Sequence, residues 1–285
     1  MKIAVHLSML CETWLDDVTR HFAELAQSGF DGVELSLYRA DPAQLEKTAG
    51  RLRDFGLALS FGAGLSPEAD ISSPDPETRK AGIAYLNRCI EDAARFCAEH
   101  LNGVLYAPWF SFCPPPEREA RRERSAGSLR QIGERAEALG VKLNLEVLNR
   151  FECDFMNTLA QGEAFLHRIG SPSVRLLADT FHMNIEENDI PEAVDMCFPS
   201  IGALHVCENH RGAPGTGHIP WRRLLTVLHR RGYSGWLTIE SFVQSGTEVG
   251  EALKIHSGRG DPLEQCIAGK RHIADILREI REKEE

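Results

Sequence analysis

The chain has 285 residues, 42% of them hydrophobic and 26% charged, which is enough to bury the core of one large α/β domain. Its 42 acidic and 32 basic residues give a formal charge of -10, which argues against nucleic acid as a partner. The start, MKIAVHLSML, is too short for a signal sequence, and no apolar run approaches membrane-spanning length. We therefore expect a soluble cytoplasmic protein without a membrane partner.

Short apolar runs alternate with longer amphipathic segments eight times along the chain. The apolar runs predict strands at Lys2–Leu7, Gly32–Leu37, Leu57–Gly62, Gly103–Ala107, Lys142–Leu148, Val174–Ala178, Ile201–Val206 and Trp236–Ser241. The amphipathic segments predict helices, among them Leu15–Gln27, Pro42–Phe55, Pro76–Glu99 and Glu117–Leu139. A strand and a helix repeated in this way predict an α/β fold, the (β/α)8 TIM barrel. Since no linker interrupts the pattern, we expect a single domain over residues 1–285.

The eight cysteines are scattered through the chain without CxxC pairs. This spacing indicates reduced thiols rather than a disulfide framework. Cys153 follows Glu152 and Cys207 lies two positions after His205, and we interpret both cysteines as small apolar core residues rather than nucleophiles.

The stretch KLNLEVLNRFE, residues 142–152, has the composition of a buried parallel strand but contains Glu146 and runs into Glu152. A carboxylate in a strand covered on both faces is costly unless it binds a cation. Three later strands end with Asp179, His205 and Glu240. In a parallel barrel, residues at the carboxyl ends of the strands carry the chemistry, and these four should share nearly one depth.

Three carboxylates and one imidazole form an oxygen-dominated set of ligands. Such a set favours Mn²⁺, Mg²⁺ or Co²⁺ over a sulfur-rich structural zinc site. A single acid at a strand end can also cap the following helix or pair with an arginine. The coincidence of four such residues favours the metal site.

Other segments supply candidate residues around this site. His182 follows Asp179 in ADTFHMN, close enough to contact the metal's surroundings or a ligand oxygen. The loop HVCENHRGAPGTGHIPW is shaped by glycine and proline and carries Arg211, together with Glu208 and His218. Arg211 would offset the carboxylate charge and donate to a sugar oxygen. Trp14 and Trp109 are candidate walls of a sugar pocket, although aromatic residues at such places are often ordinary packing.

The segments LNLEVLNRFE, ADTFHMN, HVCENHRGAPGTGHIPW and LTIESF resemble the motifs of the ketose 3-epimerases, which act on sugars such as D-tagatose, D-allulose (psicose) and L-ribulose within the xylose-isomerase-like barrels. The resemblance covers most of the chain. It implies that Glu146, Asp179, His205 and Glu240 bind the metal and that Glu146 and Glu240 are also the catalytic acid and base. It further implies that Glu152, His182 and Arg211 hold the ketose. One divalent metal ion, Mn²⁺ or Co²⁺, and a homodimer or homotetramer are implied in the same way.

The chemistry of C3 epimerisation agrees with this set of residues. The proton next to the carbonyl of a 2-ketose is a very weak acid unless the resulting cis-enediolate is stabilised, which a Lewis-acidic metal does. One carboxylate removes the proton from one face, and a second returns a proton to the other face.

Two places depart from the resemblance. After the eighth strand the chain has Ile255, His256 and Arg259 where a segment containing tryptophan and arginine is usual, and the first strand ends at His6 where an aromatic residue is usual. His6 is therefore a candidate substrate contact, and a modified keto sugar is an alternative substrate. The role of the loop Gln244–Pro262 is left open.

Alternative functions on the same scaffold share the metal set. They are an aldose–ketose isomerase, a hydroxypyruvate-type isomerase and an inosose dehydratase; the context of Glu152 and Arg211 favours 3-epimerisation. An endonuclease barrel for abasic DNA needs extra histidines at strands two to four, which this chain lacks, and its negative charge is wrong for DNA. A non-catalytic sugar-binding barrel would have lost a ligand or a carboxylate, and none is missing.

Overall fold

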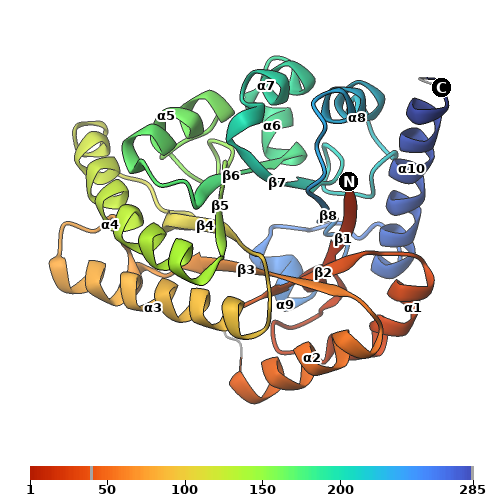
Figure 1. Ribbon diagram of the computed structural model, residues 1–285, viewed down its shortest axis with the longest axis horizontal. Helices are drawn as coiled ribbons and strands as arrows, with labels where there is room; N and C mark the ends of the chain where they lie inside the picture. The colour runs from red at the N-terminus through yellow and green to blue at the C-terminus, as the bar shows by residue number, and fades with distance from the viewer. Residues whose placement is uncertain (39–40, 284–285) are drawn as a thin grey trace. The chain divides into compact units, whose positions relative to one another are not determined.

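The computed structural model describes residues 1–38 and 41–283. Within these residues, eight strands follow one another in chain order, β1 to β8, and close into a barrel (Figure 1). Each pairing whose register is known is parallel, and helices connect the strands. The predicted (β/α)8 TIM barrel is confirmed.

The strands are β1 (Lys2–His6), β2 (Gly32–Ser36), β3 (Ala58–Leu65), β4 (His100–Pro108), β5 (Lys142–Glu146), β6 (Val174–Asp179), β7 (Ile201–Val206) and β8 (Trp236–Ile239). The α-helices are α1 (Phe22–Gln27), α2 (Pro42–Asp54), α3 (Pro76–Arg95), α4 (Arg118–Leu139), α5 (Leu159–Ile169), α6 (Thr180–Glu186), α7 (Ile190–Met196), α8 (Trp221–Arg230), α9 (Glu248–Ala252) and α10 (Pro262–Glu282). Short 3-10 helices lie at Leu7–Leu10, Val18–His21, Pro67–Ala69, Pro115–Glu117 and Phe198–Ser200. Over the described ranges, none of the helices combines the length and the apolar character needed to cross a bilayer.

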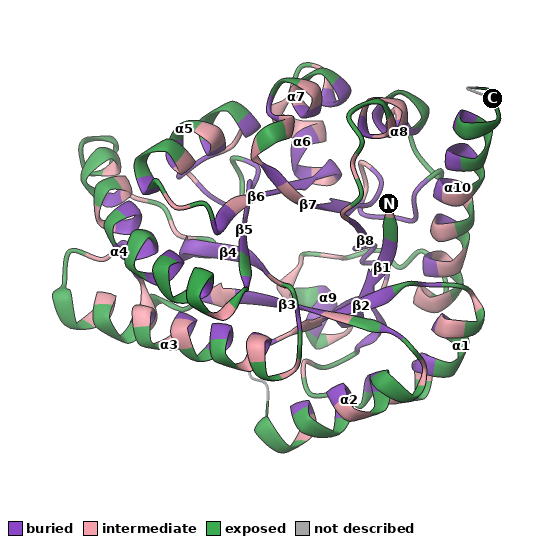
Figure 2. Cartoon of the chain, in the orientation of Figure 1, coloured by how far each residue is buried: buried purple, intermediate pink, exposed green. Residues whose placement is uncertain are grey.

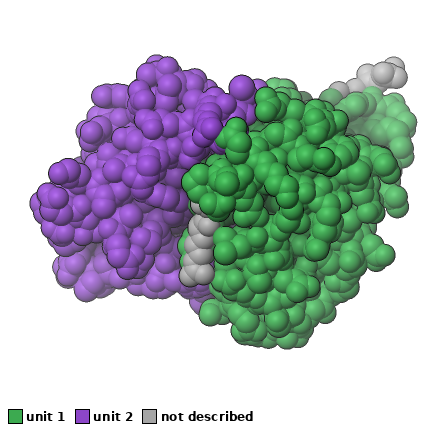
Figure 3. All heavy atoms as spheres, turned by 90° about the horizontal axis from the view of Figure 1, so that it is seen from below, with its two compact units in different colours: residues 1–59, 189–196, 204–285 green, residues 60–188, 197–203 purple. Residues whose placement is uncertain are grey.

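The chain divides into two compact units (Figure 3). Unit 1 comprises Met1–Leu59, Asp189–Met196 and Leu204–Glu285, and unit 2 comprises Ser60–Asn188 and Cys197–Ala203. Unit 1 therefore holds β1, β2 and β8, whereas unit 2 holds β4, β5 and β6. The expectation of one domain over residues 1–285 stays a prediction.

The core of each unit follows from the burial of its strands and of one stripe on each helix (Figure 2). In unit 2, β4 is buried along almost its whole length, as expected for a parallel strand covered on both faces. Helix α3 packs against α4, and its buried residues recur every three to four positions: Gly82, Leu86, Cys89, Ile90 and Ala93. In unit 1, α8 packs against α7 and α10.

Most element boundaries differ by a few residues from those predicted, and two of these differences have a local structural cause. The α-helix expected from Leu15 begins only at Phe22, after a 3-10 helix at Val18–His21, because Asp16 accepts hydrogen bonds from the backbone N–H groups of Glu12 and Thr13 and so holds residues 12–16 in a turn. Strand β4 begins at His100, earlier than expected. The polar Asn102 directly precedes the apolar run and so limits the strand that the sequence predicts. In the structure Asn102 is buried, and its side-chain oxygen accepts a hydrogen bond from Asn144 at 2.7 Å, which allows this polar group inside the sheet.

Candidate functional site

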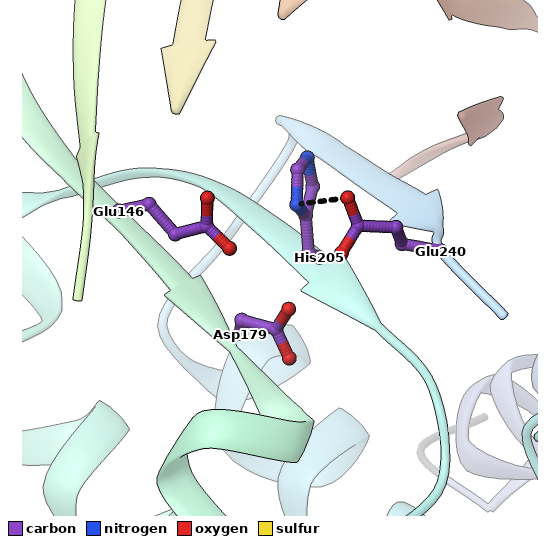
Figure 4. A group of neighbouring side chains, drawn as sticks. All are labelled: Glu146, Asp179, His205 and Glu240. Carbon is purple, nitrogen blue, oxygen red and sulfur yellow. Dashed lines mark ion pairs between the residues drawn. The ribbon is translucent and has the colours of Figure 1, made fainter. Parts of the chain in front are cut away.

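Four side chains with metal-binding groups lie at the carboxyl ends of their strands. Glu146 and Asp179 are the last residues of β5 and β6, His205 is next to last in β7, and Glu240 directly follows β8. All four are buried, and one ligand atom from each lies within 4.8 Å of the others (Figure 4). The structure thus brings together the four residues that the sequence pattern singled out.

Strand register explains how each neighbouring pair is placed. Glu146 pairs with Leu177, so Asp179 lies two positions further along β6. His205 pairs with Thr238, so Glu240 lies two positions further along the chain of β8. Because strands in a closed barrel are tilted and staggered, an offset of this kind brings the two side chains of each pair to a similar height.

The donor set of this group fits one divalent metal ion. It offers three carboxylates and one imidazole, with no sulfur ligand, which suits a hard or borderline cation. Burying several carboxylates together is costly unless positive charge compensates them. A divalent cation held by Glu146, Asp179, His205 and Glu240 would supply that charge.

The imidazole of His205 lies between two carboxylates. Its Nε2 is 3.2 Å from both carboxylate oxygens of Glu34, and its Nδ1 is 3.5 Å from Oε1 of Glu240. Burial disfavours the protonated ring, but the charges of Glu240 and Glu34 outweigh burial and hold the pKa of His205 well above its ordinary value. A metal ion bound by His205 would therefore have to displace a proton in this environment.

Glu240 is surrounded by cationic or polar donors. Arg211 donates from Nη1 to Oε2 of Glu240 at 3.0 Å, and Nε2 of His6 lies 3.9 Å from Oε1. Burial opposes the charge of Glu240, but His205, His6 and Arg211 outweigh it and lower the pKa of Glu240 well below the usual glutamate value. Glu240 is therefore ionised at neutral pH.

Arg211 is held by the loop that follows β7. Its backbone has a φ of 61°, a left-handed conformation uncommon for a residue with a side chain. The loop is fixed by the buried carboxylate of Glu208, which accepts hydrogen bonds from Trp221 Nε1 at 2.6 Å and from the N–H groups of Gly215 and Ile219. Glu208 is thus a structural residue of this loop, and His218, in the same loop, is exposed.

A second set of contacts surrounds Glu146. Nε2 of His182 lies 3.4 Å from Oε1 of Glu146. On the other side of the ring, Nδ1 of His182 accepts a hydrogen bond from the backbone N–H of Asn149 at 3.2 Å. Because a backbone N–H can only donate, this bond requires an unprotonated Nδ1 and leaves the proton on Nε2. His182 therefore presents an N–H to Glu146.

Glu152 is held by two donors. Its Oε1 accepts from Asn149 Nδ2 at 2.9 Å, and its Oε2 accepts from Trp109 Nε1 at 2.8 Å. Trp109 is half-buried beside Phe110, with ring centroids 4.5 Å apart. Trp109 is therefore both an aromatic surface and a donor that orients Glu152.

Trp14 lies in unit 1. It is half-buried against Tyr38, with ring centroids 5.2 Å apart, and lines a small cavity with Ser8, Asp16 and Gln44. No contact ties Trp14 to the metal-binding group in the described residues, so its predicted role as a pocket wall stays a prediction.

Comparison with known proteins decides the family. Residues 22–274 match the family described as the xylose isomerase-like TIM barrel. The chain belongs to this family. Within it, the chain is 31% identical over 262 residues to the D-psicose 3-epimerase of Agrobacterium fabrum, covering 90% of each protein. It is 37% identical over 228 residues to the L-ribulose 3-epimerase of Mesorhizobium japonicum, covering 79% of this chain and 76% of that one.

A solved structure agrees with these relatives. The structure of D-psicose 3-epimerase with D-tagatose from Clostridium cellulolyticum H10 superposes with a TM-score of 0.90 at 31% identity, covering 97% of this chain and 99% of that chain. The resemblance of the sequence motifs to the ketose 3-epimerases is therefore confirmed.

The sequence of this chain departs from the expected ketose 3-epimerase motifs in two segments, and these differ in their exposure to solvent. His6 is buried, and its ring packs edge-on against those of His205 and Phe242. His256 and Arg259, by contrast, are exposed in the segment after β8.

Sequence reasoning missed two polar residues of this epimerase-like site. Glu34 lies within β2 and is fully buried, and Asn149 is buried beside His182. The signal that identified Glu146, a carboxylate in a buried strand, also applies to Glu34 in GVELS. Asn149 offered no comparable signal, because it lies in a turn where asparagine is common.

Proposed function

We propose that this protein is a metal-dependent ketose 3-epimerase, which inverts the configuration at carbon 3 of a 2-ketose. The observation that carries the proposal is the buried group of Glu146, Asp179, His205 and Glu240. The relatives support it, since they are named D-psicose and L-ribulose 3-epimerases.

In the proposed reaction, Glu146 and Glu240 are the two proton carriers. One carboxylate removes the proton from carbon 3 and the electron pair passes into a cis-enediolate; the other carboxyl group, which carries a proton at the start of the step, delivers it to the opposite face. The configuration of the substrate decides which carboxylate acts first. The lowered pKa of Glu240 supports its role, because an ionised carboxylate can accept the proton.

We further propose one divalent ion at this group, Mn²⁺ foremost, with Co²⁺ or Mg²⁺ as alternatives. When bound, such an ion polarises the ketose carbonyl and stabilises the negative charge that develops as the proton leaves. The oxygen-rich donor set supports this choice of metals.

The remaining polar and aromatic residues would hold the sugar. His182 presents its Nε2–H, Glu152 is oriented by Trp109, and Arg211 donates beside Glu240. The proposed substrate contacts are Glu152, His182, Arg211, Trp14, Trp109 and His6. Hydroxyl groups of a ketose suit such a set of donors and acceptors, whereas a polyanionic substrate would not suit it.

The experiment that tests the proposal is proton exchange at carbon 3. Manganese-loaded protein is incubated in D₂O with D-tagatose, D-fructose, D-allulose and L-ribulose, and deuterium and products are followed by NMR, with chelated protein as the control. We expect deuterium at carbon 3 together with the 3-epimer, and a large loss of both on chelation. Exchange at carbon 1 with an aldose product would instead establish an aldose–ketose isomerase, and no exchange with any free ketose would contradict the proposal.

The assembly and the location of the protein stay predictions. We propose a homodimer or homotetramer in the cytoplasm, as the sequence resemblance implies. Analytical ultracentrifugation of the purified protein measures the assembly directly.

A further inference from the structure

Glu34 is a buried carboxylate that the proposed reaction does not use. It lies inside β2, where strand register pairs it with His6 of β1, and it is buried. An ionised carboxylate in such a place is costly unless a donor or a positive charge faces it. Its neighbours therefore indicate what Glu34 does.

One neighbour of Glu34 within unit 1 is His205. Both carboxylate oxygens lie 3.2 Å from Nε2 of His205, whereas Nε2 of His6 is 3.8 Å from Oε1 and is beyond hydrogen-bond distance. The other nitrogen of His205, Nδ1, lies 3.5 Å from Glu240. The two nitrogens of one ring thus face different carboxylates, and only Glu240 belongs to the metal-binding group.

A histidine binds a metal through an unprotonated nitrogen, so a neutral ring must carry its proton on the other nitrogen. An ionised carboxylate accepts hydrogen bonds but cannot donate one. Glu34 therefore stabilises the tautomer with the proton on Nε2, which leaves the lone pair of His205 on Nδ1, the nitrogen on the side of Glu240.

We propose that Glu34 is a positioning residue for the metal centre. It fixes the tautomer and the ring orientation of His205, so that Nδ1 is the metal-binding nitrogen. Partners of this kind are frequent behind metal-binding histidines, and their loss lowers metal affinity by about 10- to 100-fold. The edge-on ring of His6, with its centroid 5.9 Å from that of His205 and an interplanar angle of 78°, packs beside the imidazole and supports the same orientation. This inference rests on the metal site of the proposed function.

The test compares two variants of the full chain, Glu34→Gln and Glu34→Met. Both remove the same charge, but only glutamine keeps an oxygen that accepts a hydrogen bond from His205. Binding of Mn²⁺ is measured by calorimetry, and the visible spectrum of the Co²⁺-loaded protein reports the geometry around the ion. We expect Glu34→Met to weaken Mn²⁺ binding about 10- to 100-fold and to change the Co²⁺ spectrum, and Glu34→Gln to have a smaller effect.

Asp154→Asn is the matched control. Asp154 is a mostly buried carboxylate that pairs with Arg121 at 3.0 Å in unit 2 and contacts none of the four metal-binding residues in the described chain, so its variant should bind Mn²⁺ as the wild type does. Equal affinity and an unchanged Co²⁺ spectrum in both Glu34 variants would overturn the inference and leave the metal site standing. If Glu34→Met does not fold, Glu34→Ala, which also removes the accepting oxygen, takes its place in the same two measurements. A wild-type protein that binds neither Mn²⁺ nor Co²⁺ would overturn the metal site, and this inference with it.

Discussion

Arg211 donates from Nη1 to Oε2 of Glu240 at 3.0 Å, and both side chains are buried. The guanidinium thus stabilises the ionised form of a proposed catalytic carboxylate, and it also lies 5.7 Å from the centroid of the Phe242 ring. Because the pair is buried, the loss of one partner leaves the other with less charge compensation.

Replacing Arg211 by methionine should therefore impair turnover in a folded protein. A hydrogen bond to a charged group contributes about 1.5 to 3 kcal/mol, which corresponds to a loss of roughly ten- to a hundredfold in kcat/KM. Steady-state kinetics with the preferred ketose measure the loss. His218→Ala changes an exposed residue of the same loop and should leave kcat/KM nearly unchanged. Wild-type kinetics in Arg211→Met would show that the contact has no role in the reaction.

Replacing either of the two proposed proton carriers should abolish epimerisation but leave proton exchange in a different 3-epimer. Without Glu240, the remaining Glu146 can still exchange the proton on its own face of the sugar, but no group delivers a proton to the other face. We expect Glu240→Gln to lose epimerisation by about 100- to 10,000-fold while one of two 3-epimers still exchanges its carbon 3 proton with D₂O. Glu146→Gln should lose epimerisation to the same extent, but in this variant the other 3-epimer should exchange its carbon 3 proton. Epimerisation near the wild-type rate in either folded variant would contradict the two-carboxylate reaction.

Glu208 should stabilise the loop after β7 in a pH-dependent way. Burial opposes its charge, but donors from Trp221, Ile219, Gly215 and Gly217 outweigh burial and lower its pKa below the ordinary glutamate value of 4.5. A lowered pKa means that the stabilisation is fully present above about pH 4.5 and is lost as the pH falls through the pKa of the folded protein.

Urea unfolding of the wild type and of Glu208→Gln at neutral pH and at acid pH measures this effect. We expect the variant to be less stable by about 2 kcal/mol at neutral pH, since it loses charge-assisted hydrogen bonds. The difference should shrink at acid pH, where the wild-type carboxylate is protonated too. A difference that is the same at both pH values would show that Glu208 acts by shape rather than by charge.

The thiols should react in the order of their exposure. Cys97 is exposed and Cys113 is half-buried, whereas the other six cysteines are buried. Burial raises the pKa of Cys11 and Cys89 to about 12 and that of Cys197 to about 11, so these thiols are neither accessible nor ionised near neutral pH. A disulfide reagent at about pH 8 should label Cys97 first, and Cys97→Ser should remove the fastest phase. Rapid labelling of more than two thiols in the folded protein would contradict the burial described above.

The sequence by itself determined the type and order of the elements and the four residues of the metal-binding group. Eight repeats of a short apolar run and an amphipathic segment leave few folds other than a parallel barrel, and in such a barrel the ends of β5, β6, β7 and β8 are where polar side chains are expected. Glu146 was conspicuous because a carboxylate in a buried strand needs a reason. These inferences depend on local patterns, and local patterns are visible in a sequence.

Only the tertiary structure decided which residues support those four. Glu34 reaches His205 although 171 positions separate them, and Asn149 reaches His182 across 33. Such contacts depend on strand register and on the path of loops, which the periodicity of a sequence does not contain. The turn at residues 12–16 and the buried Asn102 differ from the prediction for the same reason, because hydrogen bonds with particular partners replaced the expected local pattern.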